Sequence, residues 1–342
     1  GSNAVFAAVT GVSIASAAVF TRVAVPEMLR LGYSPRFAVG TVAGSSVLGM
    51  LIPPSILLII YAILTEQSIG MMFFAGIGPG IILSSCYCLG IIGMAYFTPG
   101  FVYDHTGRFS DQAAIARSNP RDENSLIGIF VKALPLLGLV TIVLGGIYGG
   151  IFTPTEAGAV GALCALLLAV FRKKMGWKAF WGVLLETGHI TASICFLIIA
   201  ATMYSRSLAL AGVPMEIGEL VRTATDQFLL VLLIYVLVVL FLGTIIDSVS
   251  IILIMVPLFL PLMQGFEADI IWFGIITVLA VEVGLLTPPL GIACFVIKGC
   301  LDDPRITLGD VFIGAAPFAL MMIFVLILLT AWPHLVYINQ WI

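Results

Sequence analysis

The chain has 342 residues, of which 61% are hydrophobic and 10% are charged, and its formal net charge is −3. Soluble globular domains carry charge on about 25% of their residues. This composition therefore excludes a water-soluble globule and indicates a protein surrounded by the lipid bilayer, with no nucleic-acid partner. The apolar segments do not alternate in polarity every second residue, as strands of a membrane barrel would, so we expect an all-α integral membrane protein.

The first predicted unit, residues 1–64, is a helical hairpin followed by a broken transmembrane helix. The hairpin is expected to turn at the small, hydroxyl-rich segment 10–16 and to return along the basic stretch 22–36 without crossing the membrane. The helix over 38–64 contains the segment Gly49-Met-Leu-Ile-Pro-Pro-Ser55. Proline has no N–H and disrupts the hydrogen bonds of the preceding helical turn, so we expect the helix to break there.

The second predicted unit, residues 65–225, holds connecting helices, a polar cytoplasmic loop and scaffold helices. Its apolar segments are each long enough to cross a hydrocarbon core of ~30 Å. They are 70–97, 127–149, 154–171 and 180–204. At the start of segment 154–171, we expect Thr153 to cap the helix, Pro154 to occupy its first turn and Glu156 to lie near the positive end of the helix dipole. We interpret Glu156 as structural.

The third predicted unit, residues 226–298, repeats the order of the first. A hairpin is expected over 228–269, with its turn at 243–248. The broken helix over 270–297 contains Gly284-Leu-Leu-Thr-Pro-Pro-Leu290. A last unit, residues 299–342, is predicted to form a C-terminal transmembrane helix and a tail.

Positively charged residues indicate how these units are oriented. Arg and Lys cluster in alternate connections, which the positive-inside rule places in the cytoplasm. The alternation closes only if both hairpins are re-entrant, one opening inward and the other outward. Gly49 and Gly284 are 235 residues apart, as are Pro53 and Pro288. We infer two inverted repeats, an arrangement found in secondary transporters.

The two Pro-Pro breaks also suggest what the protein binds. Carbonyls freed at membrane depth can coordinate Na⁺, and helix N-termini directed at the same place favour a carboxylate. The side chains that we predict to contact such a substrate are Ser13, Ser16, Ser55, Asp247 and Thr287. The hydroxyls could instead bond within helices or allow close packing. Asp247 and Glu282 are functional candidates because a charge in the membrane is costly, and either could instead cap a helix or carry a proton.

Several motifs in this chain occur together in one known family. They are Phe6-Ala-Ala-Val-Thr-Gly11, Gly49-x-Leu-Ile-Pro-Pro-Ser55, Gly150-Ile-Phe-Thr-Pro-Thr-Glu-Ala157, Asp247 ahead of Pro257, and Gly284-Leu-Leu-Thr-Pro-Pro289. In these the chain resembles the large membrane (permease) subunit of the tripartite ATP-independent periplasmic (TRAP) transporters. Members usually have further helices before the first hairpin, so the resemblance implies an N-terminally incomplete chain.

The resemblance implies a sodium-coupled, binding-protein-dependent transporter that imports an organic acid by an elevator mechanism across the bacterial inner membrane. It also implies a periplasmic substrate-binding protein and a small four-helix membrane subunit as partners, with Na⁺ as coupling ion and no other cofactor. One Na⁺ would lie at each hairpin tip, held mostly by backbone carbonyls. The residues implied are Thr10, Gly49, Ile52 and Pro54 at the first tip, and Gly243, Gly284, Thr287 and Leu290 at the second.

The sequence also bears on two other classes of function. An enzyme would need a nucleophile and base, or a set of metal ligands, at membrane depth, and the three histidines are scattered. We therefore expect no catalysis. A passive channel or a non-transporting membrane scaffold remains an alternative to a transporter.

Overall fold

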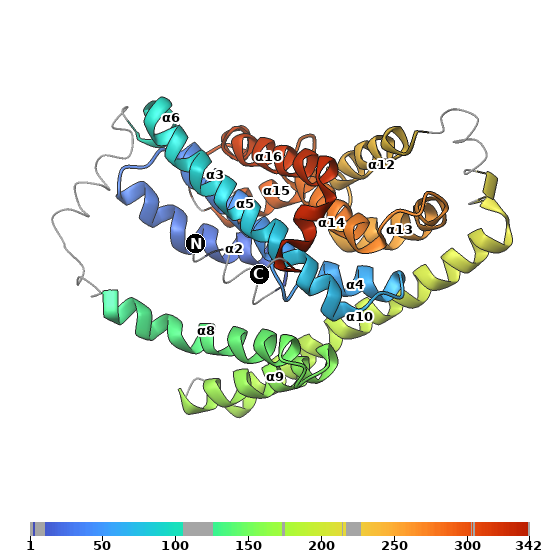
Figure 1. Cartoon of the computed structure of the whole chain (residues 1–342). Helices are drawn as coiled ribbons and strands as arrows, with labels where there is room; N and C mark the ends of the chain where they lie inside the picture. The colour runs from blue at the N-terminus through green and yellow to red at the C-terminus, as the bar shows by residue number, and fades with distance from the viewer. Residues whose placement is uncertain are drawn as a thin grey trace. The chain divides into compact units, whose positions relative to one another are not determined.

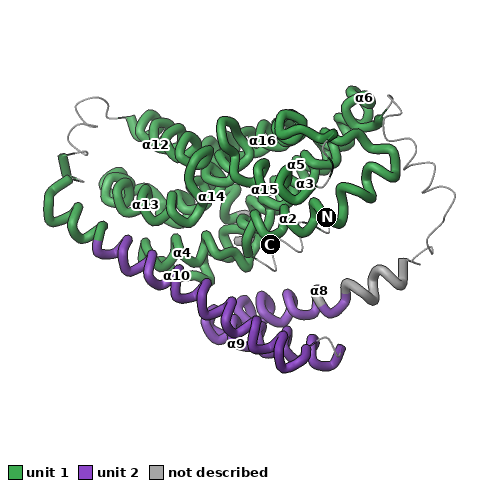
Figure 2. The backbone as a smooth tube through the Cα atoms, turned by 180° about the vertical axis from the view of Figure 1, so that it is seen from behind, with its two compact units in different colours: residues 1–119, 204–342 green, residues 120–203 purple. Residues whose placement is uncertain are grey.

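The computed structural model describes residues 3, 11–104, 126–172, 175–213, 215–216, 227–301, 303 and 305–340. These residues are almost entirely helical, which confirms the predicted all-α class, and their one β-bridge joins Tyr33 to Tyr103. The chain divides into two compact units (Figure 2). Unit 1 combines residues 1–119 with 204–342, and unit 2 comprises residues 120–203.

The first half of unit 1 contains the predicted broken helix. Its helices are α2 (Ser13–Arg30), α3 (Pro35–Leu51) and α4 (Ile56–Leu64). The Ser34 side chain accepts a hydrogen bond from the N–H of Phe37 and so caps α3, whose first residue is a proline. Between α3 and α4 the Pro53–Pro54 peptide bond is cis, and Ser55 caps the second segment. The predicted break is confirmed.

The second half of unit 1 repeats this order of helices. They are α12 (Phe228–Gly243), α13 (Ser248–Gly265), α14 (Ile270–Leu286) and α15 (Ile292–Cys300). Asp247 caps α13 and Asp269 caps α14 through their carboxylates. The Pro288–Pro289 bond is also cis. Helices α3 and α14 both have 17 residues, and α4 and α15 both have 9, so the two breaks divide their helices alike.

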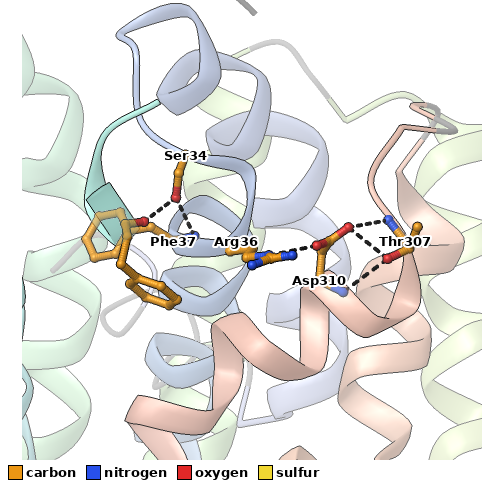
Figure 3. A network of polar contacts seen from close by, with 6 residues as sticks. Ser34, Arg36, Phe37, Thr307 and Asp310 are labelled. Atoms are coloured by element: carbon orange, nitrogen blue, oxygen red, sulfur yellow. Dashed lines mark hydrogen bonds and ion pairs between the residues drawn. The ribbon is translucent and has the colours of Figure 1, made fainter. Parts of the chain in front are cut away.

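The C-terminal helix of unit 1 packs closely on the first broken helix (Figure 1). This helix, α16 (Leu308–Ala331), is followed by the 3₁₀ segment η1 (Pro333–Gln340). A Cβ on Gly40 would lie 2.0 Å from the carbonyl oxygen of Gly314, so only glycine fits at this crossing. Close to the crossing, Arg36 pairs with Asp310 (Figure 3). Helix α16 also contacts α14, and it thus joins both broken helices.

Two further described helices lie wholly in unit 1. They are α5 (Ile69–Phe97) and the single turn α6 (Pro99–Val102). The sequence groups α5 with the connecting segment 65–225, but it packs against α3, α4, α14 and α16. Gly76 permits this approach, because a Cβ there would lie 2.6 Å from the carbonyl oxygen of Leu51.

Unit 2 is built from α8 (Leu126–Tyr148), α9 (Pro154–Phe171) and most of α10 (Trp177–Leu210). The Thr153 hydroxyl accepts the N–H of Glu156, and the Glu156 carboxylate accepts the N–H of Thr153 at 2.8 Å. This reciprocal capping box confirms the structural role predicted for Thr153, Pro154 and Glu156.

The lengths and apolar surfaces of the helices fit a multi-pass membrane protein. Within the described residues, six helical segments are long and apolar enough to cross a bilayer. They are 35–64, 69–97, 154–171, 177–210, 248–265 and 308–331. Large apolar side chains such as Leu89, Phe196 and Phe324 are exposed on them, as a hydrocarbon environment permits.

Candidate ion and substrate site

The tip of the second hairpin lies directly against the second broken helix. A Cβ on Gly243 would come within 2.8 Å of the Gly284 Cα, and a Cβ on Gly284 within 2.6 Å of the Gly243 Cα. The two backbones touch, and neither position accommodates a side chain without a shift. The structure therefore brings together two of the residues predicted to bind the second ion.

A backbone hydrogen bond extends this contact across the break. The N–H of Gly291 donates to the carbonyl of Thr244 at 3.0 Å. Gly291 has a φ of +47°, in the left-handed region that glycine adopts most readily. A Cβ built there would be 2.9 Å from the Thr287 carbonyl oxygen and 3.3 Å from that of Leu285. Backbone oxygens from the hairpin tip and from the residues before the break thus converge near Gly291.

The Pro-Pro pair removes the helical donors of two carbonyls at this break. In a continuous helix the carbonyls of Gly284 and Leu285 would accept from residues 288 and 289, which are prolines without an N–H. The Gly284 carbonyl instead accepts from the N–H and the hydroxyl of Thr287, both at 3.0 Å. Leu290, another predicted ligand, is 44% exposed, and its role stays a prediction.

The first break also leaves two carbonyls without helical donors, but different residues surround it. Its carbonyls without a helical donor belong to Gly49 and Met50, four residues before Pro53 and Pro54. Ile52 ends α3 by donating its N–H to Leu48 at 2.9 Å. Gly11, at the first hairpin apex, has a φ of +63°, and a Cβ on it would be 3.5 Å from the Pro54 carbonyl oxygen. The predicted ligand Thr10 lies outside the described residues.

The predicted substrate hydroxyls occupy different environments. Ser16 is buried and donates to Asn3, whose amide also bonds the Val42 carbonyl at 3.1 Å. Ser55 is buried and caps α4, while Ser13 is buried without a hydrogen-bond partner among the described residues. Sequence reasoning missed Asn3, which joins α2 to α3.

Thr287 and Asp247 both bond to backbone groups of their own helices. Thr287 donates its hydroxyl to the Val283 carbonyl at 2.7 Å, one turn back. Asp247 is exposed and accepts from the N–H and the hydroxyl of Ser250, at 3.0 and 2.7 Å. The capping alternative for Asp247 is therefore realised in the structure. A substrate role for either residue stays a prediction.

Glu282 is the other carboxylate singled out by the sequence, and it is deeply buried. Its side chain is 1% exposed, and its Oε1 accepts a hydrogen bond from Ser248 Oγ at 3.2 Å. Ser248 begins α13 at the hairpin tip. Sequence reasoning did not pair these residues, because nothing in the spacing of 34 positions indicates that they meet.

A separate cavity of about 720 Å³ lies between α2 and the connection from α15 to α16. Its polar lining includes Thr21, Arg22 and Arg305, and positive-inside orientation places it toward the cytoplasm. The Arg305 side chain donates to both Asp303 oxygens, and this pairing holds the pKa of the Asp303 carboxyl below its usual value.

Comparison with known proteins supports the family resemblance that the sequence motifs indicate. A family model described as the tripartite ATP-independent periplasmic transporter, DctM component, matches residues 1–335. The chain is similar to the C4-dicarboxylate TRAP transporter large permease protein DctM of Pseudomonas aeruginosa. The two are 35% identical over 329 residues, which cover 96% of this chain and 73% of that protein.

Other relatives carry different names. The sialic acid TRAP transporter large permease protein SiaM of Vibrio cholerae is 31% identical over 331 residues, covering 96% of this chain and 73% of its own. The 2,3-diketo-L-gulonate TRAP transporter large permease protein YiaN of Escherichia coli is 28% identical over 340 residues, covering 99% of this chain and 76% of its own. The solutes in these names differ, so similarity of this degree does not fix the substrate.

Proposed function

The chain belongs to the DctM component family of the tripartite ATP-independent periplasmic transporters, and from this we propose that it imports an organic acid by sodium-coupled secondary transport. As a TRAP large permease subunit it works with a periplasmic binding protein and a small membrane subunit. We assign it to the bacterial inner membrane and take the small subunit to have four helices. The relatives' names include C4-dicarboxylates and sialic acid, which are carboxylates.

The observation that carries the sodium proposal is the glycine contact at the second break. Gly243 and Gly284 bring the hairpin tip within van der Waals distance of a helix whose carbonyls have lost their helical donors. Unwound backbone of this kind supplies the oxygens that coordinate Na⁺ in transporters with discontinuous helices. We place one ion at each Pro-Pro break, with Gly49 among its ligands at the first and Gly284 at the second.

The substrate is proposed to lie between the two breaks. Helices α4 and α15 each begin at a break, and the partial positive charge of a helix N-terminus favours a carboxylate. Ala293, buried in the first turn of α15, offers no hydrogen-bonding side chain, so we do not assign C4-dicarboxylate or sialic acid specificity to this chain.

An elevator mechanism is proposed from the repeated architecture. Each half pairs a hairpin with a broken helix of equal segment lengths, and in secondary transporters with inverted repeats one part of the protein moves as a rigid body against another. The two hairpins and broken helices would form the moving part, and helices of residues 65–225 would contribute a scaffold.

The test is uptake into proteoliposomes that contain this chain, its small subunit and the cognate binding protein. We expect saturable uptake of a radiolabelled organic acid that requires both the binding protein and an inward Na⁺ gradient. Uptake that continues unchanged after the Na⁺ gradient is collapsed would exclude sodium coupling. Non-saturable flux without the binding protein would favour a passive channel.

A further inference from the structure

A buried polar cluster lies where the starts of α2 and α13 meet α14. Its centre is the Glu282 carboxylate, which is 1% exposed. Only Oε1 has a hydrogen bond, from Ser248 Oγ at 3.2 Å, and Oε2 has no partner among the described residues. Ser13, at the start of α2, is fully buried, and its hydroxyl lies near the same carboxylate.

A second unpartnered hydroxyl lies within range of the Glu282 charge. Tyr87 of α5 is 4% exposed, and its ring packs edge-on against Phe318. Its hydroxyl oxygen is buried without a described hydrogen-bond partner, and the charge of Glu282 acts on it. The buried side-chain oxygens without a partner in the described residues are those of Ser13, Tyr87 and Glu282, and all three therefore belong to one region.

An occupant that supplies positive charge would satisfy this region. A buried carboxylate is destabilised unless it is paired or bonded, and none of the ion pairs between described residues involves Glu282. A proton on Glu282 would remove the charge and let the carboxyl donate to the Ser13 oxygen, so protonation is the competing way to satisfy this group. A small cation would use the carboxylate oxygen and the hydroxyl lone pairs together.

Two other carboxylates of the chain differ from Glu282 in their hydrogen-bond donors. Both Asp303 oxygens accept from Arg305, and Asp310 accepts from Arg36 and from Thr307. Each has donors from charged or backbone groups, and each is at least partly exposed. Glu282 is buried and has one neutral donor, which distinguishes it from these structural carboxylates.

We propose that Glu282, Ser13 and Ser248 form a side-chain binding site for a monovalent cation of the size of Na⁺. The site is distinct from the two backbone sites at the Pro-Pro breaks and goes beyond the proposed function, because it adds a third ion. One carboxylate matches one positive charge. Its ligands come from the starts of α2 and α13 and from α14, so a bound ion would join elements of both repeats.

The experiment is equilibrium binding of ²²Na⁺ to the purified full chain in detergent, with its small subunit, without any transport step. Glu282→Gln keeps the volume of the side chain and removes its charge, and Ser13→Ala removes one ligand. The matched control is Ser46→Ala, a buried α3 hydroxyl that bonds only to the Ala43 carbonyl of its own helix. Gel filtration shows whether each variant remains folded.

We expect Glu282→Gln to bind one Na⁺ fewer per chain and Ser13→Ala to weaken one class of site at least several-fold, while Ser46→Ala binds like the wild type. If Glu282→Gln does not fold, the affinity of Ser13→Ala decides. Unchanged ion number and affinity in the folded variants would refute this third site and leave sodium coupling intact. No Na⁺ binding by the wild type would refute both proposals.

Discussion

Arg36 and Asp310 join the first turn of α3 to the first turn of α16, with the guanidinium Nε donating to the carboxylate at 2.8 Å (Figure 3). Asp310 also accepts the N–H and the hydroxyl of Thr307, at 3.0 and 2.7 Å, and so caps its own helix. A few residues further, Gly40 and Gly314 bring the two backbones into contact. A charged pair and a glycine crossing therefore hold the C-terminal helix against the first broken helix.

The crossing predicts that Gly314→Val destabilises the protein. The new Cβ would lie 2.1 Å from the Arg36 carbonyl oxygen, which is backbone and has little room to move. Overpacking of this kind costs about 1–3 kcal/mol or more. The apparent melting temperature in detergent should fall, whereas Gly182→Val, with nothing within 4 Å of the new Cβ, should change it little. Equal melting temperatures for the two variants would contradict the crossing.

Asp310→Ala should cost more stability than Arg36→Ala. The Arg36 side chain is 51% exposed and that of Asp310 is 20% exposed, and surface ion pairs contribute about 0–1 kcal/mol. Loss of Asp310 removes this pair and the capping interaction with Thr307, which is worth ~1 kcal/mol. Denaturation of both variants and of the double variant would measure the difference. Equal losses would show that the cap contributes nothing.

Gly243→Val should abolish transport while the protein still inserts in the membrane. The Cβ of the new side chain would lie 2.8 Å from the Gly284 Cα. It would therefore push the hairpin tip away from the broken helix and displace the oxygens proposed to hold Na⁺. Proteoliposome uptake and the amount of membrane-inserted protein are measured together. Gly188→Val, in a position with open space, serves as the control, and full uptake by Gly243→Val would count against this ion site.

Tyr61 links the two broken helices, and we expect its loss to lower the stability of the protein. Its hydroxyl donates to the carbonyl of Ile270 at 2.7 Å, from α4 to the start of α14. Tyr61→Phe removes one hydrogen bond, worth about 0.5–1.5 kcal/mol. Gly274→Ala should cost more, since its Cβ would lie 2.4 Å from the Tyr61 ring. We therefore expect the melting temperature of Gly274→Ala to fall further below that of the wild type than the melting temperature of Tyr61→Phe.

Proline chemistry and capping made much of the helical order predictable from sequence. Both breaks follow from residues without an N–H, and the start of α9 follows from Thr153 and Glu156. The predicted spans 70–97 and 154–171 agree with α5 and α9 to within a residue. These features depend on neighbours in the chain, so their signals are local.

Contacts between distant segments were not predictable in the same way. The sequence shows glycines at 40, 243, 284 and 314 but not which of them pair. A glycine indicates only a close approach of another segment and does not identify that segment. Ser248 and Glu282 are 34 residues apart, and their meeting depends on the packing of α13 against α14. The ion and substrate assignments therefore stay predictions, while the elements that carry them are established.

The equal segment lengths of the two broken helices have a consequence for the direction of transport. If 17 residues precede each break and 9 follow it, helix length alone provides no way to distinguish entry from exit. A preference for one direction must then arise from side chains that differ between equivalent positions. The residue after each Pro-Pro pair is one such difference, because Ser55 is buried and polar whereas Leu290 is apolar and exposed.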